Sequence, residues 1–572
     1  MAGRLLRSRW LGNRVAYRDA HALQRGLWGS GRDDWLLLLE HSHTYTMGVR
    51  AKAEHVLVDP ASVGAELLHA DRGGDVTYHG PGQLVGYPIL SVPSRPNSMP
   101  CYVHGIEQLL IDVLDDLGLP GASRLEGYPG VWVGAPGSSP RKIAAIGVRV
   151  SKGRSMHGFA LNVDPDLSYF AHIVPCGIAD KPVTSLAAEG VGASMREVVD
   201  AVVARAVSGW GYDVLDRQDV AWRISDTDLA AFTQGKGPGA PVPAGGSPAR
   251  PSPARGEPVR LLGRLAQAGV DLAAGVAIDE RKPEWLRVKA RMGEDYRGLK
   301  RTVKELGLVT VCEEAGCPNI FECWADGTAT FMINGDRCTR ACGFCLVDTR
   351  KPLPPDLGEP ARVAAAVGRM GLAHAVVTTV ARDDLPDGGA SGFAATIEAI
   401  HATSPGTAVE VLISDCRGHD PSLQAIFDAR PEILNHNLET VARLQRAVRP
   451  SASYTRSLGV LARAKAAGLT TKSGLIVGMG ETFAEVLSAL ADLHGVGVDI
   501  VTVGQYLRPT SHHLPVARWW TPDEFHRVRL AGEGLGLPHV EASPLTRSSY
   551  HARQAAESSA SSASASSAAS SR

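Results

Sequence analysis

Apolar and polar positions follow two different patterns along the 572-residue chain, and the pattern changes near residue 232. Before that point, apolar runs such as 35–40 (WLLLLE) and 142–150 (KIAAIGVRV) predict strands. A helical period predicts a helix that stops at Gly118 and carries on one face Val103, Ile106, Leu109, Leu110, Val113, Leu114 and Leu117. A capping-box pattern, Ser194 followed by Glu197, opens another predicted helix. This mixture predicts an α+β domain.

After residue 260, short β-rich apolar runs are separated by helical stretches. Six such runs lie near residues 330, 377, 411, 434, 475 and 502, and helical segments such as 455–468 lie between most of them. Strands that alternate with helices indicate parallel βαβ units. Six units fall short of the eight in a complete barrel, so we expect an open, partial (β/α)6 barrel of the TIM type.

Two segments of biased composition divide this multidomain chain. Residues 235–258 contain 13 Gly or Pro in 24 positions, which no packed element can use, so we expect a linker over 233–259. Residues 558–571 are only Ser and Ala, which predicts a disordered tail over 553–572. The predicted domains are therefore 1–232 and 260–552.

Composition narrows the class of protein. Hydrophobic residues make up 44% of the chain and charged residues 21%, as in a globular protein, and the net charge of −1 gives no basic field for nucleic acid. No apolar run reaches the roughly 18 residues of a membrane span, and the N-terminus has no signal-peptide pattern. We expect a cytoplasmic protein that binds neither nucleic acid nor membrane. In that compartment clustered cysteines favour metal ligation or catalysis over disulfides.

Three cysteines, Cys338, Cys342 and Cys345, follow the first predicted barrel strand with the spacing C-x3-C-x2-C. Barrel active sites form at the carboxyl ends of strands, so the position suits a reactive centre. Structural zinc takes four ligands, and catalytic zinc more often includes His or carboxylate, so zinc fits poorly. Three thiolates on one loop suit a [4Fe–4S] cluster that leaves one iron open to another ligand. A zinc site or a simple electron-transfer site is the alternative.

A second triplet, Cys312, Cys317 and Cys323, precedes the first with the spacing C-x4-C-x5-C. Alone this spacing is weakly specific, and any single member could be a buried structural thiol. The first triplet in the context CTRACGFC resembles the radical S-adenosylmethionine superfamily. Both triplets together with RSSY at 547–550 closely resemble lipoyl synthase, over residues 280–552. Segments that add to this resemblance include RDDLPDGGA (382–390) and TKSGLIVGMGET (471–482).

The lipoyl synthase resemblance implies two [4Fe–4S] clusters. S-adenosylmethionine would bind the open iron of the cluster on Cys338, Cys342 and Cys345. The other triplet would hold an auxiliary cluster, with Ser549 as its fourth ligand, that is consumed as the sulfur source. The implied partners are an electron donor such as ferredoxin or flavodoxin and an iron–sulfur carrier. The implied reaction inserts two sulfurs, at C6 and C8 of a protein-bound octanoyl chain.

The N-terminal part contains a Gly-rich stretch at 72–90 that is not a P-loop, because G-x4-G-K-[ST] is absent. Alone it could be a plain turn. Together with RKIAAIGVRV (141–150), HGFALNV (157–163) and PCGIAD (175–180), it closely resembles lipoyl(octanoyl) transferase over residues 1–232, a biotin/lipoate-ligase-like fold. The resemblance implies an octanoyl pocket lined by Arg72, Gly73, Gly74, Asp75, Val76, Thr77, Tyr78, His79, Ala145, Ile146, Gly147, Gly158, Phe159 and Ala160.

The catalytic pair of that family corresponds to Cys176 and Lys142. A thiolate is the nucleophile, and a nearby ammonium stabilises it. The thiolate would take octanoate from octanoyl-acyl carrier protein and pass it to a lysine of an apo lipoyl domain, and the amide of Gly177 could donate to the oxyanion. Such domains occur in 2-oxoacid dehydrogenase acyltransferase subunits and the glycine cleavage H protein. His79 is not assigned as a base, and Cys101 and Cys416 are expected to be structural.

Two rival interpretations remain open at this point. The first domain could be an ATP-dependent lipoate ligase, since the two families share a fold, although Cys176 argues against it. Alternatively, the chain could be a two-cluster electron carrier or scaffold without catalysis. Such a protein would need neither Lys142 and Cys176 nor a six-unit barrel.

Overall fold

The computed structural model describes residues 3–134, 139–178, 180–220, 258–271, 275–287, 301–310, 319–320, 323, 327–549 and 554. The chain divides into two compact units, Met1–Trp222 and Arg223–Arg572. Cys312, Cys317, most of the predicted linker and almost all of the predicted tail lie outside the described residues. The linker and tail therefore stay predictions.

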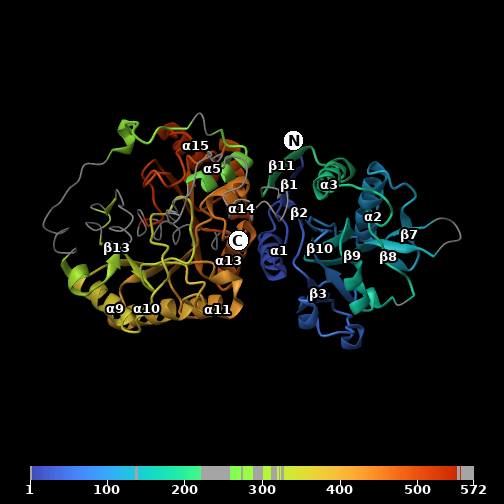
Figure 1. Ribbon diagram of the computed structural model, residues 1–572, viewed down its shortest axis with the longest axis horizontal. Helices are drawn as coiled ribbons and strands as arrows, with labels where there is room; N and C mark the ends of the chain where they lie inside the picture. Colours follow the sequence, from blue (N-terminus) through green and yellow to red (C-terminus); the bar gives the residue numbers. More distant parts are fainter. Residues whose placement is uncertain are drawn as a thin grey trace, which may run out of the picture. The chain divides into compact units, whose positions relative to one another are not determined.

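The first unit is built on a mixed eight-stranded sheet with the order β11-β1-β2-β6-β10-β9-β8-β7 (Figure 1). Strands β11, β1 and β2 are parallel, and the rest pair antiparallel. The bounds are β1 (Leu5–Trp10), β2 (Asp34–Leu39), β6 (Gln83–Ile89), β7 (Ser123–Leu125), β8 (Tyr128–Val133), β9 (Arg141–Ser151), β10 (Arg154–Asn162) and β11 (Val214–Asp219). A second, three-stranded sheet has the order β4-β3-β5, with β3 (Thr44–Met47), β4 (Glu66–His69) and β5 (Val76–His79).

Three α-helices pack on the large sheet: α1 (Tyr17–Ser30), α2 (Ser98–Asp116) and α3 (Met195–Gly209). The predicted apolar face of α2 is buried from Ile106 to Leu114 in the core that α2 shares with α3 and the sheet. The capping box at α3 is present, because the Ser194 hydroxyl accepts from the Glu197 N–H and the Glu197 carboxylate accepts from the Ser194 N–H. Short 3-10 turns complete the unit: η1 (Ala53–His55), η2 (Pro60–Val63), η3 (Leu167–His172) and η4 (Pro175–Gly177).

The second unit contains an open eight-stranded sheet in sequence order, β12 to β19. Strands β13 to β19 are all parallel, and β12 pairs antiparallel with β13. The bounds are β12 (Val309–Thr310), β13 (Thr328–Ile333), β14 (His374–Thr379), β15 (Ala408–Leu412), β16 (Ile433–Asn435), β17 (Thr470–Val477), β18 (Ile500–Gln505) and β19 (His539–Ala542). The six predicted strands are β13 to β18, and the expected partial barrel is confirmed. Strand β19 was not predicted from the sequence.

Helices follow most of the parallel strands, as βαβ connectivity requires. Figure 1 shows α9, α10 and α11 along one edge of this unit. The described helices are α5 (Pro258–Gln267), α9 (Glu359–Met370), α10 (Ala390–Thr403), α11 (Asp420–Asp428), α12 (Gln445–Val448), α13 (Tyr454–Ala466), α14 (Phe483–Gly495) and α15 (Pro522–Leu535), with 3-10 turns η5 (Glu284–Leu286), η6 (Cys416–Gly418) and η7 (Ala442–Leu444). The core between the sheet and α9, α10, α11 and α13 contains Phe331, Val377, Phe393 and Ile426.

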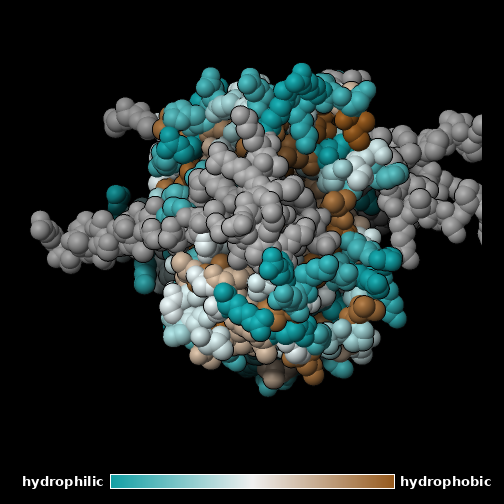
Figure 2. All heavy atoms as spheres, turned by 90° about the vertical axis from the view of Figure 1, so that its left-hand side faces the viewer, coloured by the Kyte–Doolittle hydropathy of each residue, from teal (hydrophilic) through white to brown (hydrophobic). Residues whose placement is uncertain are grey.

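Among the coloured residues in Figure 2, hydrophilic side chains are common along the upper part and the lower right of the face, with smaller hydrophobic patches between them. Among the described helices, none combines the length and apolar composition needed to cross a bilayer.

Candidate functional site

The first unit contains a cavity of about 670 Å³ bounded by strands of both its sheets. Antiparallel pairing of β9 and β10 sets Gly147 opposite Gly158, Ile146 opposite Phe159 and Ala145 opposite Ala160, so two separate sequence motifs meet in one wall. The cavity lining includes these predicted site residues: Arg72, Gly73, Gly74, Asp75, Thr77, His79, Lys142, Ala145, Ile146, Gly147, Gly158, Phe159, Ala160 and Cys176.

Two residues of the predicted pocket run lie elsewhere. Val76 and Tyr78 are fully buried in a separate small core with Tyr45 and Phe170. Successive side chains of β5 point to opposite faces, so Thr77 and His79 reach the cavity while Val76 and Tyr78 support the small sheet from behind.

Cys176 lies on the 3-10 turn η4 and is half-buried. Its backbone is left-handed, with φ 56°, a conformation that L residues with a Cβ adopt at a cost and that clusters at functional sites. The N–H of the next residue, Gly177, donates to the carbonyl of Val174 at 3.0 Å. The Gly177 amide is therefore engaged within the turn, and the expectation that it is available to an oxyanion is not met in this conformation.

Lys142 is buried at the start of β9, opposite Trp132 and beside an irregularity in the β8–β9 ladder. Its N–H donates to Pro182 at 2.9 Å, and its carbonyl accepts from Thr184 at 2.9 Å, so both sides of its peptide are fixed. Its Nζ lies 4.7 Å from the centre of the Trp132 ring, a cation–π contact. The aromatic ring and the ladder hold the ammonium in the cavity wall.

The buried Arg72 side chain organises the Gly-rich loop. Its guanidinium donates to the carbonyls of Gly73 and Asp75, at 3.1 and 2.8 Å, and to the Thr46 carbonyl at 2.6 Å. Gly74 has φ +95°, which favours glycine. The loop is thus held by its own arginine, and it brings Asp75 to the cavity.

The buried imidazole of His79 in the cavity wall and that of His41 behind it are both hydrogen-bonded within the protein. His79 bonds to Gln83 at 2.8 Å through Nδ1, and burial holds its pKa well below its ordinary value. His41 Nε2 accepts from the Tyr87 hydroxyl at 2.7 Å, and burial lowers the pKa of His41 to about 4. Both rings are neutral near pH 7 and serve as fixed hydrogen-bonding groups.

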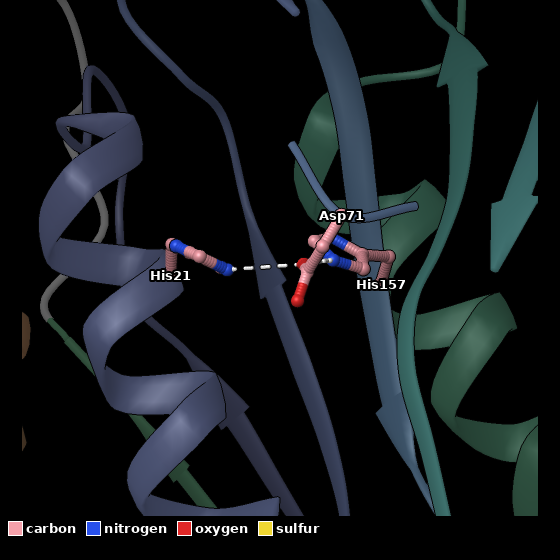
Figure 3. A group of neighbouring side chains, drawn as sticks. All are labelled: His21, Asp71 and His157. Carbon is pink, nitrogen blue, oxygen red and sulfur yellow. Dashed lines mark hydrogen bonds and ion pairs between the residues drawn. The ribbon is translucent and has the colours of Figure 1, made fainter. Parts of the chain in front are cut away.

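Asp71, next to this loop, gathers His21 and His157 around its carboxylate (Figure 3). His157 Nε2 lies 2.7 Å and His21 Nε2 3.4 Å from Asp71 Oδ1, and Arg149 pairs with Oδ2. Hydrogen bonds from His157 and His21 lower the pKa of Asp71 far below its usual range. Histidine and aspartate are common metal ligands, but here the Asp71 carboxylate is already paired with the guanidinium of Arg149. The group therefore ties β9, β10 and α1 to the loop.

In the second unit, Cys338, Cys342 and Cys345 follow β13 on one loop, and all three are half-buried. Cys338 Sγ accepts N–H groups from Arg340 at 3.4 Å and Ala381 at 3.3 Å. Burial raises the pKa of Cys345 to about 12, and it also raises that of Cys342. Cluster formation must displace these protons. Three thiols on one loop, with N–H donors aimed at one sulfur, fit a [4Fe–4S] cluster.

Arg340 ties this loop to the loops after the next two strands. Its guanidinium donates to both oxygens of Asp383 at 2.7 Å and to Asp415 Oδ1 at 2.6 Å. Thr339 adds a backbone bond to Ala381 at 2.9 Å. The carboxyl ends of β13, β14 and β15 are thereby joined, as expected for a reactive centre of a barrel.

Only part of the second cysteine triplet falls in the described residues. Cys323 is half-buried, and its N–H donates to Asn319 O at 3.0 Å. The Asn319 side chain donates to the Leu545 carbonyl at 2.7 Å. This bond places the Cys323 segment beside the segment that leads to Ser549. Whether Cys312, Cys317, Cys323 and Ser549 share a cluster stays a prediction.

His55, whose imidazole can act as an acid or a base, lines the cavity and was not predicted from the sequence. Its Nδ1 lies 2.7 Å from Asp75 Oδ2. A single histidine in the segment AKAEHVLV has no spacing to another ligand or base, so no sequence signal identifies it. The contacts of Arg340 with Asp415 were missed for the same reason, since the two residues lie 75 positions apart.

Comparison with known proteins identifies a family for each of the two units. Residues 16–206 match the lipoyl protein ligase A/B catalytic domain. Residues 332–493 match the radical SAM superfamily, and residues 270–317 match the N-terminal domain of lipoyl synthase of that family. The chain thus joins a lipoyl protein ligase A/B type of catalytic domain to a radical SAM protein.

The relatives place the second part more narrowly. Lipoyl synthase of Kineococcus radiotolerans is 57% identical over 273 residues, 48% of this chain and 82% of the relative. Lipoyl synthase of Mycobacterium tuberculosis is 55% identical over 278 residues, which cover 49% of this chain and 89% of the relative. Through its C-terminal half, the chain belongs to the lipoyl synthase family. Membership implies a [4Fe–4S] cluster and S-adenosylmethionine as cofactors.

Solved structures with similarity include a bipartite lipoate protein ligase system from Thermoplasma acidophilum, at 21% identity and a TM-score of 0.32, covering 40% of this chain and 90% of that one. Another is SuiB of Streptococcus suis bound to S-adenosylmethionine, at 10% identity and a TM-score of 0.30. The similarity covers 37% of this chain and 49% of SuiB.

Proposed function

We propose that the chain is a bifunctional enzyme of lipoate biosynthesis. The first unit transfers octanoate from octanoyl-acyl carrier protein to a lysine of an apo lipoyl domain. The second inserts sulfur at C6 and C8 of that octanoyl chain. The proposal rests on one observation: Cys176 and Lys142 line the same cavity, on the same chain as the Cys338–Cys345 loop.

The first unit's residues divide the acyl transfer between them. The sulfur of Cys176 attacks the thioester and becomes the acyl carrier, and the Lys142 ammonium stabilises negative charge at that sulfur. The walls around Ile146 and Phe159 shield the alkyl chain from water. The acyl group then passes to the amine of the target lysine, in lipoyl domains of 2-oxoacid dehydrogenases or the glycine cleavage H protein.

In the second unit, Cys338, Cys342 and Cys345 would hold a [4Fe–4S] cluster whose open iron binds S-adenosylmethionine. That cluster, when bound, supplies the electron for radical chemistry. Arg340, Asp383 and Asp415 fix the loop so that the three sulfurs keep one geometry. We assign Cys312, Cys317, Cys323 and Ser549 to an auxiliary cluster that gives up its sulfur, with ferredoxin or flavodoxin as electron donor and an iron–sulfur carrier for repair.

One experiment tests the acyl-transfer assignment against ATP-dependent ligation. Full-length protein is mixed with octanoyl-carrier protein and apo lipoyl domain, with and without ATP. We expect octanoyl-lysine at the same rate in both mixtures, and none with Cys176→Ala. A strict ATP requirement, with free octanoate as substrate and full activity of Cys176→Ser, would overturn the assignment. A parallel incubation with S-adenosylmethionine and reductant that yields no 5′-deoxyadenosine would refute the radical assignment and favour an electron carrier.

A further inference from the structure

His55 and Asp75 form a hydrogen-bonded pair in the wall of the cavity that contains Cys176. His55 Nδ1 lies 2.7 Å from Asp75 Oδ2, and Asp75 Oδ1 accepts the N–H of Val76 at 2.6 Å. Both side chains are mostly buried, at 19% and 12% exposure. A carboxylate only accepts, so the Nδ1–H of His55 donates to Asp75, and in the neutral ring Nε2 then carries the lone pair. Within the part of the chain that the structure describes, Nε2 of His55 has no hydrogen-bond partner.

The pair is attached to the Cys176 turn by backbone and by contact. The His55 carbonyl accepts the Val174 N–H at 2.8 Å, and Val56 bridges to Ile173. A Cβ placed on Gly177 would lie 2.9 Å from Asp75 Oδ2 and 3.5 Å from His55 Cε1. The imidazole and its carboxylate therefore pack against the residue that follows the nucleophile.

The other two histidines of the cavity differ from His55. His79 uses Nδ1 on Gln83, and its Nε2 lies 3.4 Å from the Thr46 hydroxyl. His157 bonds to Asp71 through Nε2, and its Nδ1 is buried. Among the described cavity histidines, His55 alone combines an orienting carboxylate with a solvent-accessible, unbonded ring nitrogen.

We propose that His55 is a proton-transfer group of the acyl-transfer site, oriented by Asp75, in addition to Lys142. This inference rests on the proposed acyl transfer. As the bond from Cys176 sulfur to the acyl carbon forms, the thiol proton moves to His55 Nε2. As the carrier's carbon–sulfur bond breaks, that proton moves to the departing carrier thiolate. The net change is one thioester exchanged for another, with no oxidant or reductant. A nucleophile, an imidazole base and a carboxylate that orients it recur on unrelated folds.

Asp75 acts through His55 and is a positioning residue. In Asp75→Asn, the amide can donate to Nδ1, which favours the tautomer with the proton on Nε2. That tautomer cannot accept the thiol proton, although the side chain keeps its size.

The test follows acylation of Cys176 in the full chain by rapid quench and intact-mass measurement, with octanoyl-carrier protein as donor. We expect His55→Ala to slow acylation by about 10²- to 10⁴-fold, the range for a general base. We also expect the acylation rate of His55→Ala to depend on pH differently from the wild-type rate, because the general base has been removed. Added imidazole should restore part of the His55→Ala rate. Asp75→Asn should show a smaller loss and an altered pH profile. His69→Ala, at an exposed position of β4, is the control and should match the wild type.

Two outcomes overturn the inference. The first is that His55→Ala is acylated at the wild-type rate and with the wild-type pH profile. The second is that added imidazole restores none of the His55→Ala rate and that Asp75→Asn keeps the wild-type pH profile. A wild-type chain that never acylates Cys176 is a different result, because it refutes the proposed acyl transfer itself. Thermal unfolding of each variant, compared with His69→Ala, verifies that the fold is kept.

Discussion

Arg340 forms a bidentate ion pair with Asp383, two N–H···O bonds of 2.7 Å, while its own backbone N–H points at the sulfur of Cys338. Within the cysteine loop, Arg340 thus contacts the sulfur of Cys338 and also joins the loop to the carboxyl end of β14. The pair is largely buried, and Asp415 completes it from a third loop. Fork-to-fork pairing fixes orientation as well as position, which a lysine cannot reproduce.

Arg340→Gln is expected to damage the cysteine loop, because it leaves the buried Asp415 without its strongest partner. Removing one partner of a buried pair costs about 3–5 kcal/mol of unfolding free energy. We expect lower iron content after reconstitution and a changed electron paramagnetic resonance spectrum of the reduced cluster, and Arg340→Lys should only partly restore both. Arg350→Gln, an exposed arginine on the same loop, is the control. Wild-type iron content and spectrum in Arg340→Gln would show that the loop holds its geometry unaided.

Lys142→Met is expected to reduce the proposed octanoyl transfer by roughly 10²-fold or more, because the cavity that contains Cys176 loses its ammonium while the buried volume is kept. Single-turnover kinetics of lysine acylation measure this. Lys152→Met removes an exposed lysine from the turn after β9 and should leave the rate unchanged. Equal rates in the two variants would remove Lys142 from the mechanism.

Glu410 and Lys472 form an ion pair inside the barrel, with Nζ 3.0 Å from Oε1 and both side chains 0% exposed. Burial alone would raise the pKa of Glu410, but the charge of Lys472 and a bond from His374 lower it to about 2. Since an unfolded Glu has a pKa near about 4.3, the pair stabilises the fold above that pH, and this contribution is lost as pH falls toward about 2.

Glu410→Gln should therefore unfold more easily than the wild type at pH 7, by about 3–5 kcal/mol. The difference should shrink between about pH 4 and pH 2, where the wild-type carboxylate becomes protonated. Denaturant unfolding of both proteins at several pH values, followed through the transition of the second unit, measures this difference in unfolding free energy. The exposed Glu398→Gln is the control. A penalty that does not change with pH would contradict the titration account.

Gly504 lies on β18 against the segment that leads to Ser549. A Cβ there would lie 2.0 Å from the Thr546 carbonyl oxygen, so Gly504→Ala must displace that segment. If Ser549 holds the auxiliary cluster, iron in the reconstituted protein should fall from about eight toward about four per chain. Formation of 5′-deoxyadenosine should persist, because the Cys338 loop is not touched. Ser549→Ala should give the same pattern, and full iron content in both variants would exclude Ser549 as a ligand.

The sequence predicted the fold where its signal is local and strong. Runs of β-branched residues in β14, β15 and β18 are buried on both faces, so their hydrophobicity marks them. Strand β19, His539–Ala542, has only four residues with two of them polar, and its place is decided by pairing with β18. Tertiary context, not local pattern, defines such a strand.

Only the site residues that belong to recognisable sequence motifs could be predicted from the sequence. Cys176 and Lys142 come from motifs, and the fold places both in the lining of one cavity, Lys142 on β9 and Cys176 on the turn η4. The alternation that removes Val76 and Tyr78 from the pocket depends on the register of β5 against β3. His55 lies on the 3-10 turn η1 between β3 and β4 and bonds to Asp75 just before β5, a contact that no sequence spacing encodes. The engaged amide of Gly177 depends on backbone geometry alone.

The central claim is that one chain performs two consecutive steps on one lysine. It is tested by mass spectrometry of an apo lipoyl domain after anaerobic incubation with reconstituted full-length protein, octanoyl-carrier protein, S-adenosylmethionine and reductant. We predict lipoyl-lysine with the wild type, unmodified lysine with Cys176→Ala, and octanoyl-lysine alone with Cys345→Ala. Lipoyl-lysine formed by Cys176→Ala, or unmodified lysine left by Cys345→Ala, would contradict the account.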